Sequence, residues 1–405
     1  MSSIPAANSK QRDPRLDGLR GVAIALVLLW HYFVNQVQWG GDSPAIVRGI
    51  GAVLGMTWSG VDLFFVLSGF LIGGILVDHK DSPAFFKTFY IRRICRIIPV
   101  YYALLLATVL GGAWFGGSAA ANGLFQIEHP VWSYATFTQT IGIARTGQLG
   151  GIWLGVTWSL AIEEHFYLIA PLLVYWLPRR HLFPVVATLT CLAMALRVAI
   201  NFSLPEYKHL NFILMPCRAD ALLFGVMGAL AVRHAPLREA IERNVKSLYL
   251  PWLALLTGVV VIGLTRERFV SDLMFIFGYA WLGLFYLATL LICVHERSGF
   301  ISAVCSTKLL QKLGIISYGV YLFHQPVSGL LHGCLLGSKP TMTDGSSALT
   351  TVLALVLTLT LAKLSFTFFE RPIIEFGHRF RYQTASASAG EPEDKKDRDH
   401  ASPGE

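Results

Sequence analysis

Long apolar stretches separated by short polar segments dominate the 405-residue chain. About ten of these stretches are roughly 20 residues long, which is the length of a helix that crosses a ~30 Å hydrocarbon core. The pattern therefore predicts an all-α, polytopic transmembrane helix bundle of about ten spans. The predicted spans are residues 19–37, 60–77, 98–115, 154–177, 183–202, 212–232, 248–264, 273–294, 314–336 and 347–370.

Composition supports lipid as the main solvent of this chain. Apolar residues make up 54% of it, charged residues 14%, and the mean hydropathy is +0.54, which excludes an ordinary soluble protein. The net charge of +8 does not indicate nucleic acid, because the basic residues form short strips between apolar runs rather than one solvated face. The six cysteines have no close-spaced CxxC partners, which favours reduced, buried thiols over a disulfide framework or a zinc site.

The distribution of positive charge predicts the topology. With alternating sides assigned to the loops, 24 of the 33 Lys and Arg residues lie on the side of the N-terminus and six on the other side. The positive-inside rule then places both termini in the cytoplasm. We expect three parts: a cytoplasmic N-terminal segment at 1–18, a transmembrane domain at 19–376, and a disordered cytoplasmic tail at 377–405 that is too polar to fold by itself.

The first span carries two ionisable residues on one stripe. Arg20 and His31 are eleven residues apart, so they lie within about 20° of the same helix face and roughly 16 Å apart along the axis. Arg20 is expected near the cytoplasmic surface and His31 near the bilayer middle, where an ionisable group is costly and usually faces a wet cavity or a partner. The alternative for His31 is a core histidine bonded to a neighbouring helix. Asp17 is the expected N-cap of this helix.

The fourth span places two carboxylates and a histidine inside an apolar run. Ser159, Glu163 and Tyr167 follow one another at helical spacing and form one polar stripe, whereas Glu164 and His165 point elsewhere. The alternative to a functional role is a hydrogen-bond network that only holds helices together. A metal site is disfavoured, because no HxxxH or HExxH pair supplies ligands at helical spacing.

The ninth span carries a second histidine near the middle of the membrane. His324 follows Tyr318 and Tyr321 by two turns and one turn, and Pro326 is expected to kink the helix there. The two tyrosines have an alternative role as membrane-interface anchors.

A basic cluster lies between the second and third spans. Arg93 and Arg96 present two guanidinium groups on one helix face, at the membrane level expected for Arg20. Three arginines at one mouth fit a polyanionic carrier such as coenzyme A. The alternative is a pure topology signal, since positive-inside loops have this composition.

Three further charges lie in apolar runs. Asp62 lies in the second span, and Arg218 and Asp220 in the sixth. Arg218 is expected to pair with Asp62 or Asp220, either as a structural ion pair or as part of a substrate site.

Taken together, these motifs resemble the membrane acyltransferase-3 family of bacterial integral membrane O-acyltransferases, over Asp17 to Pro372. The similarity rests on six segments in order: Arg20 with His31, Asp62 to Gly69, Arg93 with Arg96, Trp158 to Tyr167, Ser317 to His324, and Glu370 to Pro372.

The resemblance implies a multi-pass protein of a bacterial inner membrane that transfers an acyl group, commonly from acetyl-CoA, to a hydroxyl of a carbohydrate or glycosylated acceptor. Acceptor candidates include lipopolysaccharide O-antigen, exopolysaccharide, a lipid-linked oligosaccharide and a glycosylated natural product. No tightly bound cofactor, metal or nucleic acid is expected. Some family members carry an added SGNH-type domain, and we expect the chemistry of such a domain to be absent here or to come from a partner.

On this hypothesis His31, Glu163 and His324 are catalytic. His31 is the general base or a transient acyl carrier, Glu163 orients it or tunes its protonation, and His324 polarises the carbonyl or positions the acceptor. The residues expected to bind substrate are Arg20, Arg93, Arg96, Asp62, Ser159, Tyr167, Arg218 and Tyr321. The competing hypothesis is a transporter or flippase for a glycolipid or small anion, and a third is a non-catalytic membrane scaffold.

Overall fold

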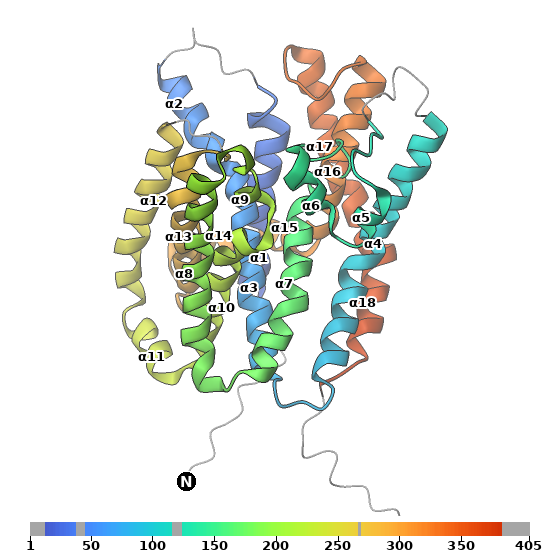
Figure 1. Ribbon diagram of the computed structural model, residues 1–405. Coiled ribbons are helices and arrows are strands. Elements are labelled where there is room, and N and C mark those ends of the chain that lie inside the picture. Colours follow the sequence, from blue (N-terminus) through green and yellow to red (C-terminus); the bar gives the residue numbers. More distant parts are fainter. Residues whose placement is uncertain (1–12, 38–44, 116–123, 266–268, 383–405) are drawn as a thin grey trace, which may run out of the picture.

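The computed structural model describes residues 13–37, 45–115, 124–265 and 269–382. These residues are helical throughout apart from turns and connections, and the β-type pairing among them is one isolated bridge between Val37 and Met342. The all-α prediction is therefore confirmed (Figure 1).

The helices follow one another in a simple up-and-down order, with short helices between the long ones. The long helices are α1 (Pro14–Leu28), α3 (Gly60–Asp78), α4 (Phe85–Phe115), α7 (Thr157–Trp176), α8 (Arg179–Ser203), α10 (Met215–Arg233), α12 (Tyr249–Leu264), α13 (Tyr279–His295), α16 (Ser317–Leu336) and α17 (Gly345–Ser365). The shorter ones are α2 (Ala45–Leu54), α5 (Val131–Ala135), α6 (Gln139–Thr146), α9 (Leu210–Ile213), α11 (Ala235–Arg243), α14 (Phe300–Cys305), α15 (Lys308–Ile315) and α18 (Arg371–His378).

Each predicted span overlaps one long helix. Eight helical segments among the described residues are long and apolar enough to cross a membrane. The two long helices outside that set, α7 and α16, are 20 residues each, and they carry the polar motifs of the fourth and ninth predicted spans. The chain is thus a multi-pass membrane protein, while the count of ten spans and the cytoplasmic position of both termini stay predictions.

The first helix begins earlier than expected. Asp13 is its N-cap, since its side chain accepts a hydrogen bond from the Arg15 backbone N–H, and Pro14 occupies the first helical position. The prediction of Asp17 as the N-cap was wrong, because the Asp-Pro pair upstream supplies a better start. Asp17 lies instead in the first turn, near Arg20.

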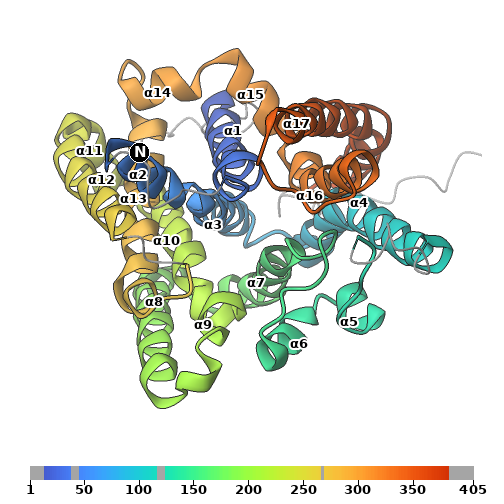
Figure 2. The ribbon, with the colours of Figure 1, turned by 90° about the horizontal axis from the view of Figure 1, so that it is seen from above.

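The bundle is organised around α3, which packs against α1, α7 and α10. Viewed from above, α8, α10, α12 and α13 lie on one side of α1 and α3, and α4, α16 and α17 lie on the other, with α7 between the two groups (Figure 2). The crossing of α3 and α10 is close because glycines meet there. A Cβ at Gly69 would overlap the Leu222 carbonyl oxygen, and one at Gly225 would overlap that of Val66.

Among the described residues, three helices contain π-helical segments, at Leu29–Val34, Met274–Gly278 and Phe366–Glu370. The first continues α1 and carries His31, and the third joins α17 to α18. Such segments insert a residue into the helix, shift its side chains around the axis, and are frequent at functional sites. The α17 helix has a capping box at its start, where hydrogen bonds from Ser347 and Ser346 lower the pKa of Asp344 to about 2.

The C-terminal helix α18 packs along α4. Gly377 faces Cys95, the Arg92 guanidinium donates to the Phe380 carbonyl oxygen at 2.7 and 3.0 Å, and the rings of Tyr382 and His79 stack with centroids 3.9 Å apart. Of the predicted tail at 377–405, the structure describes residues up to 382, which dock on the bundle. The rest of that tail, and residues 1–12 of the predicted N-terminal segment, lie outside the described residues.

Candidate active site

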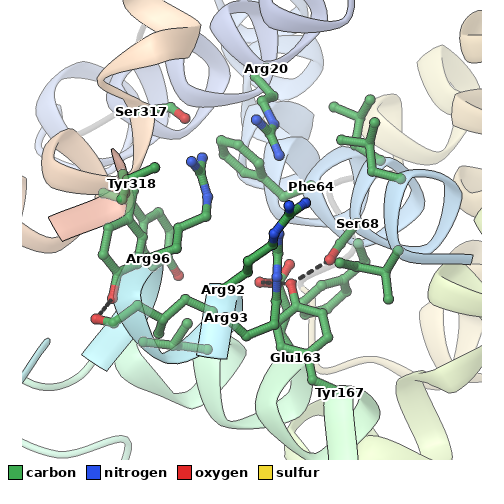
Figure 3. Close-up of a pocket in the computed structure, with 18 of the residues that line it drawn as sticks. Arg20, Phe64, Ser68, Arg92, Arg93, Arg96, Glu163, Tyr167, Ser317 and Tyr318 are labelled. Carbon is green, nitrogen blue, oxygen red and sulfur yellow. Dashed lines mark hydrogen bonds between the residues drawn. The ribbon is translucent and has the colours of Figure 1, made fainter. Parts of the chain in front are cut away.

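A cavity of about 430 Å³ lies between α1, α3, α4, α7, α16 and α18. One wall is apolar and comes largely from α3, with Phe64, Leu71 and Ile75 among its residues. The other walls are more polar and carry arginines from α1 and α4 together with Glu163 and Tyr167 of α7 (Figure 3). A cavity with one apolar side and a few convergent polar groups has the general composition of a small-molecule site.

Arginines from separate helices converge on this cavity. Arg20 reaches it from α1, Arg92, Arg93 and Arg96 from α4, and Arg371 from α18. Figure 3 shows the guanidinium groups of Arg20 and of the α4 arginines directed into the same space from two sides. The predicted arginine cluster is therefore brought together, and it is larger than the sequence interpretation assigned.

The acidic residue of the cavity is Glu163 on α7. Tyr167 donates its hydroxyl hydrogen to Glu163 Oε2 at 3.1 Å and accepts a hydrogen bond from Ser68 of α3 at 2.6 Å (Figure 3). Arg93 lies 6.0 Å from the centre of the Tyr167 ring. The polar stripe predicted on this helix thus faces the cavity, and one carboxylate stands among several cations.

Tyr321, Ser159 and Phe64 form one end of the cavity. Tyr321 is the last residue along α16 that lines it. The Tyr321 hydroxyl donates to the Val156 carbonyl oxygen at 2.9 Å and accepts from the Ser159 hydroxyl at 2.6 Å. The Phe64 and Tyr321 rings meet edge to face with centroids 6.3 Å apart. All three side chains line the cavity.

The two predicted histidines lie together just beyond this end. The His31 and His324 rings meet edge to face with centroids 4.8 Å apart, and the His324 and Tyr321 rings are 5.7 Å apart. Neither histidine lines the cavity. Glu163 is hydrogen-bonded to Tyr167 rather than to either histidine, so the described conformation does not bring Glu163 and His31 together.

The hydrogen bonds of the histidines define their tautomers. His31 Nδ1 lies 3.0 Å from the Val27 carbonyl oxygen, and His324 Nδ1 lies 2.6 Å from that of Tyr321. Because a carbonyl oxygen only accepts, Nδ1 carries the hydrogen in both rings, and each neutral Nε2 holds a lone pair. His324 Nε2 is buried without a hydrogen-bond partner among the described residues.

Buried hydrogen bonds hold the segment that carries His31. Gln36 donates to the His31 carbonyl oxygen at 2.8 Å and accepts from Thr351 of α17 at 2.9 Å. Tyr32 donates to the His324 carbonyl oxygen at 2.7 Å, which links the same segment to α16. The histidine pair is thereby fixed to three helices.

Asp62 and Arg218 do not line the cavity. They form an ion pair in which each residue is 1% exposed, and the Arg218 guanidinium lies 3.6 Å from the centre of the Tyr279 ring. Next to them, Arg197 pairs with Asp220 at 2.8 Å. Of the two partners left open for Arg218, the structure selects Asp62.

Sequence reasoning left out several residues of the cavity wall. Arg92, Arg371, Ser68, Tyr318 and His378 all line it. Ser68, Tyr318 and Arg371 stand inside segments already singled out. Arg92 is one turn from Arg96, so helical spacing could have found this arginine. Among the described residues, no group of three or more His, Cys, Asp or Glu side chains could hold a metal ion.

These features define a multi-pass membrane protein with an arginine-lined cavity and an adjacent pair of imidazoles whose Nε2 atoms carry lone pairs. The acyltransferase-3 family, described as an acyltransferase domain, matches residues 13–365. The chain belongs to this family.

Curated relatives include proteins named for acetyl transfer. The putative peptidoglycan O-acetyltransferase YrhL of Bacillus subtilis is 28% identical, over 90% of this chain and 55% of its own length. The peptidoglycan O-acetyltransferase OatA of Listeria monocytogenes is 27% identical, over 91% and 57%. The O-acetyltransferase OatA of Staphylococcus aureus is 26% identical, over 90% and 58%. The chain thus spans little more than half the length of these relatives, and no solved structure matches it.

Proposed function

We propose that this chain transfers an acyl group, in the first place acetyl, from acyl-CoA to a hydroxyl of a carbohydrate or glycosylated acceptor. The observation that carries the proposal is the convergence of Arg20, Arg92, Arg93, Arg96 and Arg371 on one cavity with an apolar wall. Guanidinium groups bind phosphate oxygens through paired, charge-assisted hydrogen bonds. An apolar wall suits the uncharged arm that carries the thioester.

The acceptor class is supported by the relatives, two of which are named for peptidoglycan, a carbohydrate polymer. The arrangement of charge supports a cytoplasmic donor, because the arginine-lined part of the cavity lies on the side that the positive-inside rule assigns to the cytoplasm. The proposal therefore includes a multi-pass location in a bacterial inner membrane, with residues 19–376 as the acyltransferase domain and both termini cytoplasmic.

The chemistry follows from the tautomers. His31 Nε2 accepts the hydrogen of the acceptor hydroxyl while the hydroxyl oxygen forms a bond to the acyl carbonyl carbon. The carbon–sulfur bond breaks, and the proton passes from His31 to the departing CoA thiolate. His324 Nε2, with its own lone pair, positions the acceptor by accepting a second hydroxyl hydrogen. Glu163 acts on the donor side, where its ionised form limits how firmly the arginines hold the product CoA.

The test is transfer of radiolabel from acetyl-CoA to envelope glycans in membranes that contain the wild type, Arg93→Ala/Arg96→Ala or His31→Ala at matched abundance. Each lost charge-assisted hydrogen bond is worth about 1.5–3 kcal/mol, so the double variant is expected to raise the KM for acetyl-CoA roughly 100-fold or more. His31→Ala is expected to abolish transfer while the protein still accumulates.

The matched control is Arg180→Ala/Arg243→Ala, which removes two exposed arginines that do not line the cavity. It should transfer label as the wild type does. Equal loss in both double variants would mean that only net charge matters. Normal transfer by His31→Ala would remove His31 from the mechanism. If the wild type transferred no label from any acyl-CoA to any glycan, the transporter hypothesis would take precedence.

A further inference from the structure

The histidine pair lies outside the wall of the cavity in this structure. Tyr321 and Ser159 line the cavity, whereas His324, one turn after Tyr321 on α16, does not. The first helix shows the same boundary, because Arg20 lines the cavity and His31, further along, does not. A donor held by the arginines therefore meets the Tyr321 ring before it reaches either imidazole.

The Tyr321 side chain is held in this position from three directions. Its hydroxyl is tied to α7 by the Val156 carbonyl oxygen and the Ser159 hydroxyl. Phe64 of α3 packs edge to face against the ring, and His324 lies on its other side. The same phenol thus closes the cavity and contacts one of the histidines.

We propose that Tyr321 is a gate between the donor cavity and the histidine pair, latched shut by Ser159 and the Val156 carbonyl group. This inference rests on the proposed function, in which an acyl thioester must reach His31. The ring turns aside when the donor arm fills the cavity, and its hydroxyl then leaves the two oxygens on α7. With the cavity empty, the gate separates the thioester-binding space from water and hydroxyl groups on the histidine side.

The neighbourhood suits such a movement. The latch consists of two neutral hydrogen bonds, which are individually weak and can be exchanged for bonds to a ligand. The fixed part of α16 lies one turn further on, where the His324 carbonyl oxygen accepts from Tyr32 of α1. The ring can therefore rotate about its own side-chain bonds while the backbone that carries His324 stays in place.

The gate is tested by chemical access to position 31, which does not depend on catalysis. The protein carrying His31→Cys is placed in inverted membrane vesicles, which expose the face proposed to be cytoplasmic, and is treated with a small anionic methanethiosulfonate. Modification of the introduced thiol is followed over time by mass spectrometry of the peptide that contains it. The matched reporter is Ser68→Cys, on the donor side of the gate.

With Tyr321 present, His31→Cys should be modified much more slowly than Ser68→Cys. Tyr321→Phe, which keeps the ring but loses the latch of two neutral hydrogen bonds, should accelerate modification at position 31 by roughly tenfold. Tyr321→Ala, which also removes the ring, should accelerate it further, and both variants should leave the rate at position 68 unchanged. The phenylalanine variant tests the gate even where the alanine variant does not accumulate.

Equal rates at positions 31 and 68 with Tyr321 intact, or no acceleration in either Tyr321 variant, would overturn the gate. The labelling result does not depend on the activity assay. If the Tyr321 variants accelerate labelling but the protein transfers no acyl group, the gate is supported and the proposed function is refuted. If the protein transfers acetyl groups but the variants do not accelerate labelling, the function is supported and the gate is refuted.

Discussion

Replacing Arg218 by Met is expected to destabilise the bundle strongly, and removing the charge of Asp62 at the same time is expected to restore most of the stability. Both residues are 1% exposed and paired with each other, so the single variant leaves a buried carboxylate with no cation directly against it. Breaking a buried ion pair from one side typically costs about 3–5 kcal/mol. The cation–π contact with Tyr279 is lost in the same step and is part of that range rather than an addition to it.

The double variant Asp62→Asn/Arg218→Met removes both charges and keeps similar side-chain volumes. Replacing both members of a buried pair is often neutral for stability, so this variant is expected within about 1 kcal/mol of the wild type. The coupling energy of the double-mutant cycle should then exceed about 2 kcal/mol. Unfolding in detergent micelles by added sodium dodecyl sulfate supplies the four free energies, and exposed Arg243→Met serves as the control.

The same cycle separates the two roles predicted for this pair. If Arg218→Met is as stable as the wild type but inactive, the charge acts on substrate and the structural interpretation fails. If the double variant is stable and retains transfer, Asp62 and Arg218 support the fold and the predicted substrate-binding role is withdrawn.

Two further predictions concern the helix crossing and the histidine segment. Gly69→Ala should lower stability by about 1–3 kcal/mol, because the new Cβ overlaps the backbone of Leu222; Gly49→Ala, where the space is open, is the control in the same detergent assay. Gln36→Leu removes the hydrogen bond to the His31 carbonyl oxygen far from the donor arginines, so it should reduce kcat roughly tenfold with the KM for acetyl-CoA unchanged, measured by steady-state kinetics. A raised KM with normal kcat would show that Gln36 acts on donor binding instead.

The helices and the faces of the site helices were predictable because both depend on local periodicity. Ser159, Glu163 and Tyr167 were placed on one stripe from helical spacing, and all three line the cavity. Arg93 and Arg96 share a face for the same reason. These features need only the geometry of one helix.

What the sequence could not supply is how far the cavity reaches and which distant side chains complete it. Regular helical spacing predicts Arg20 and His31 on one stripe, but His31 lies in a π-helical segment and the cavity includes only Arg20. Tyr321 and Phe64 from other helices pack together at the end of the cavity near His31. Arg371 joins the wall through the packing of α18 on α4, which depends on contacts across most of the chain.

Helical spacing could have excluded Asp220 as the partner of Arg218. Asp220 is two residues away on the same helix, and residues at that spacing point in different directions. The structure pairs Asp220 with Arg197 of α8 and leaves Asp62 for Arg218. The pairing of Arg197 had no sequence signal beyond its position inside an apolar run.

The packing of α18 on α4 also bears on how the protein is made. The cavity takes walls from α1, near the start of the chain, and from α18, close to the end of the described residues. During synthesis the earlier helices enter the membrane before α18 has left the ribosome, so the growing chain has Arg20 and the α4 arginines in place while one side of the cavity is still missing. On the proposed function, donor binding should therefore begin only when α18 has docked on α4.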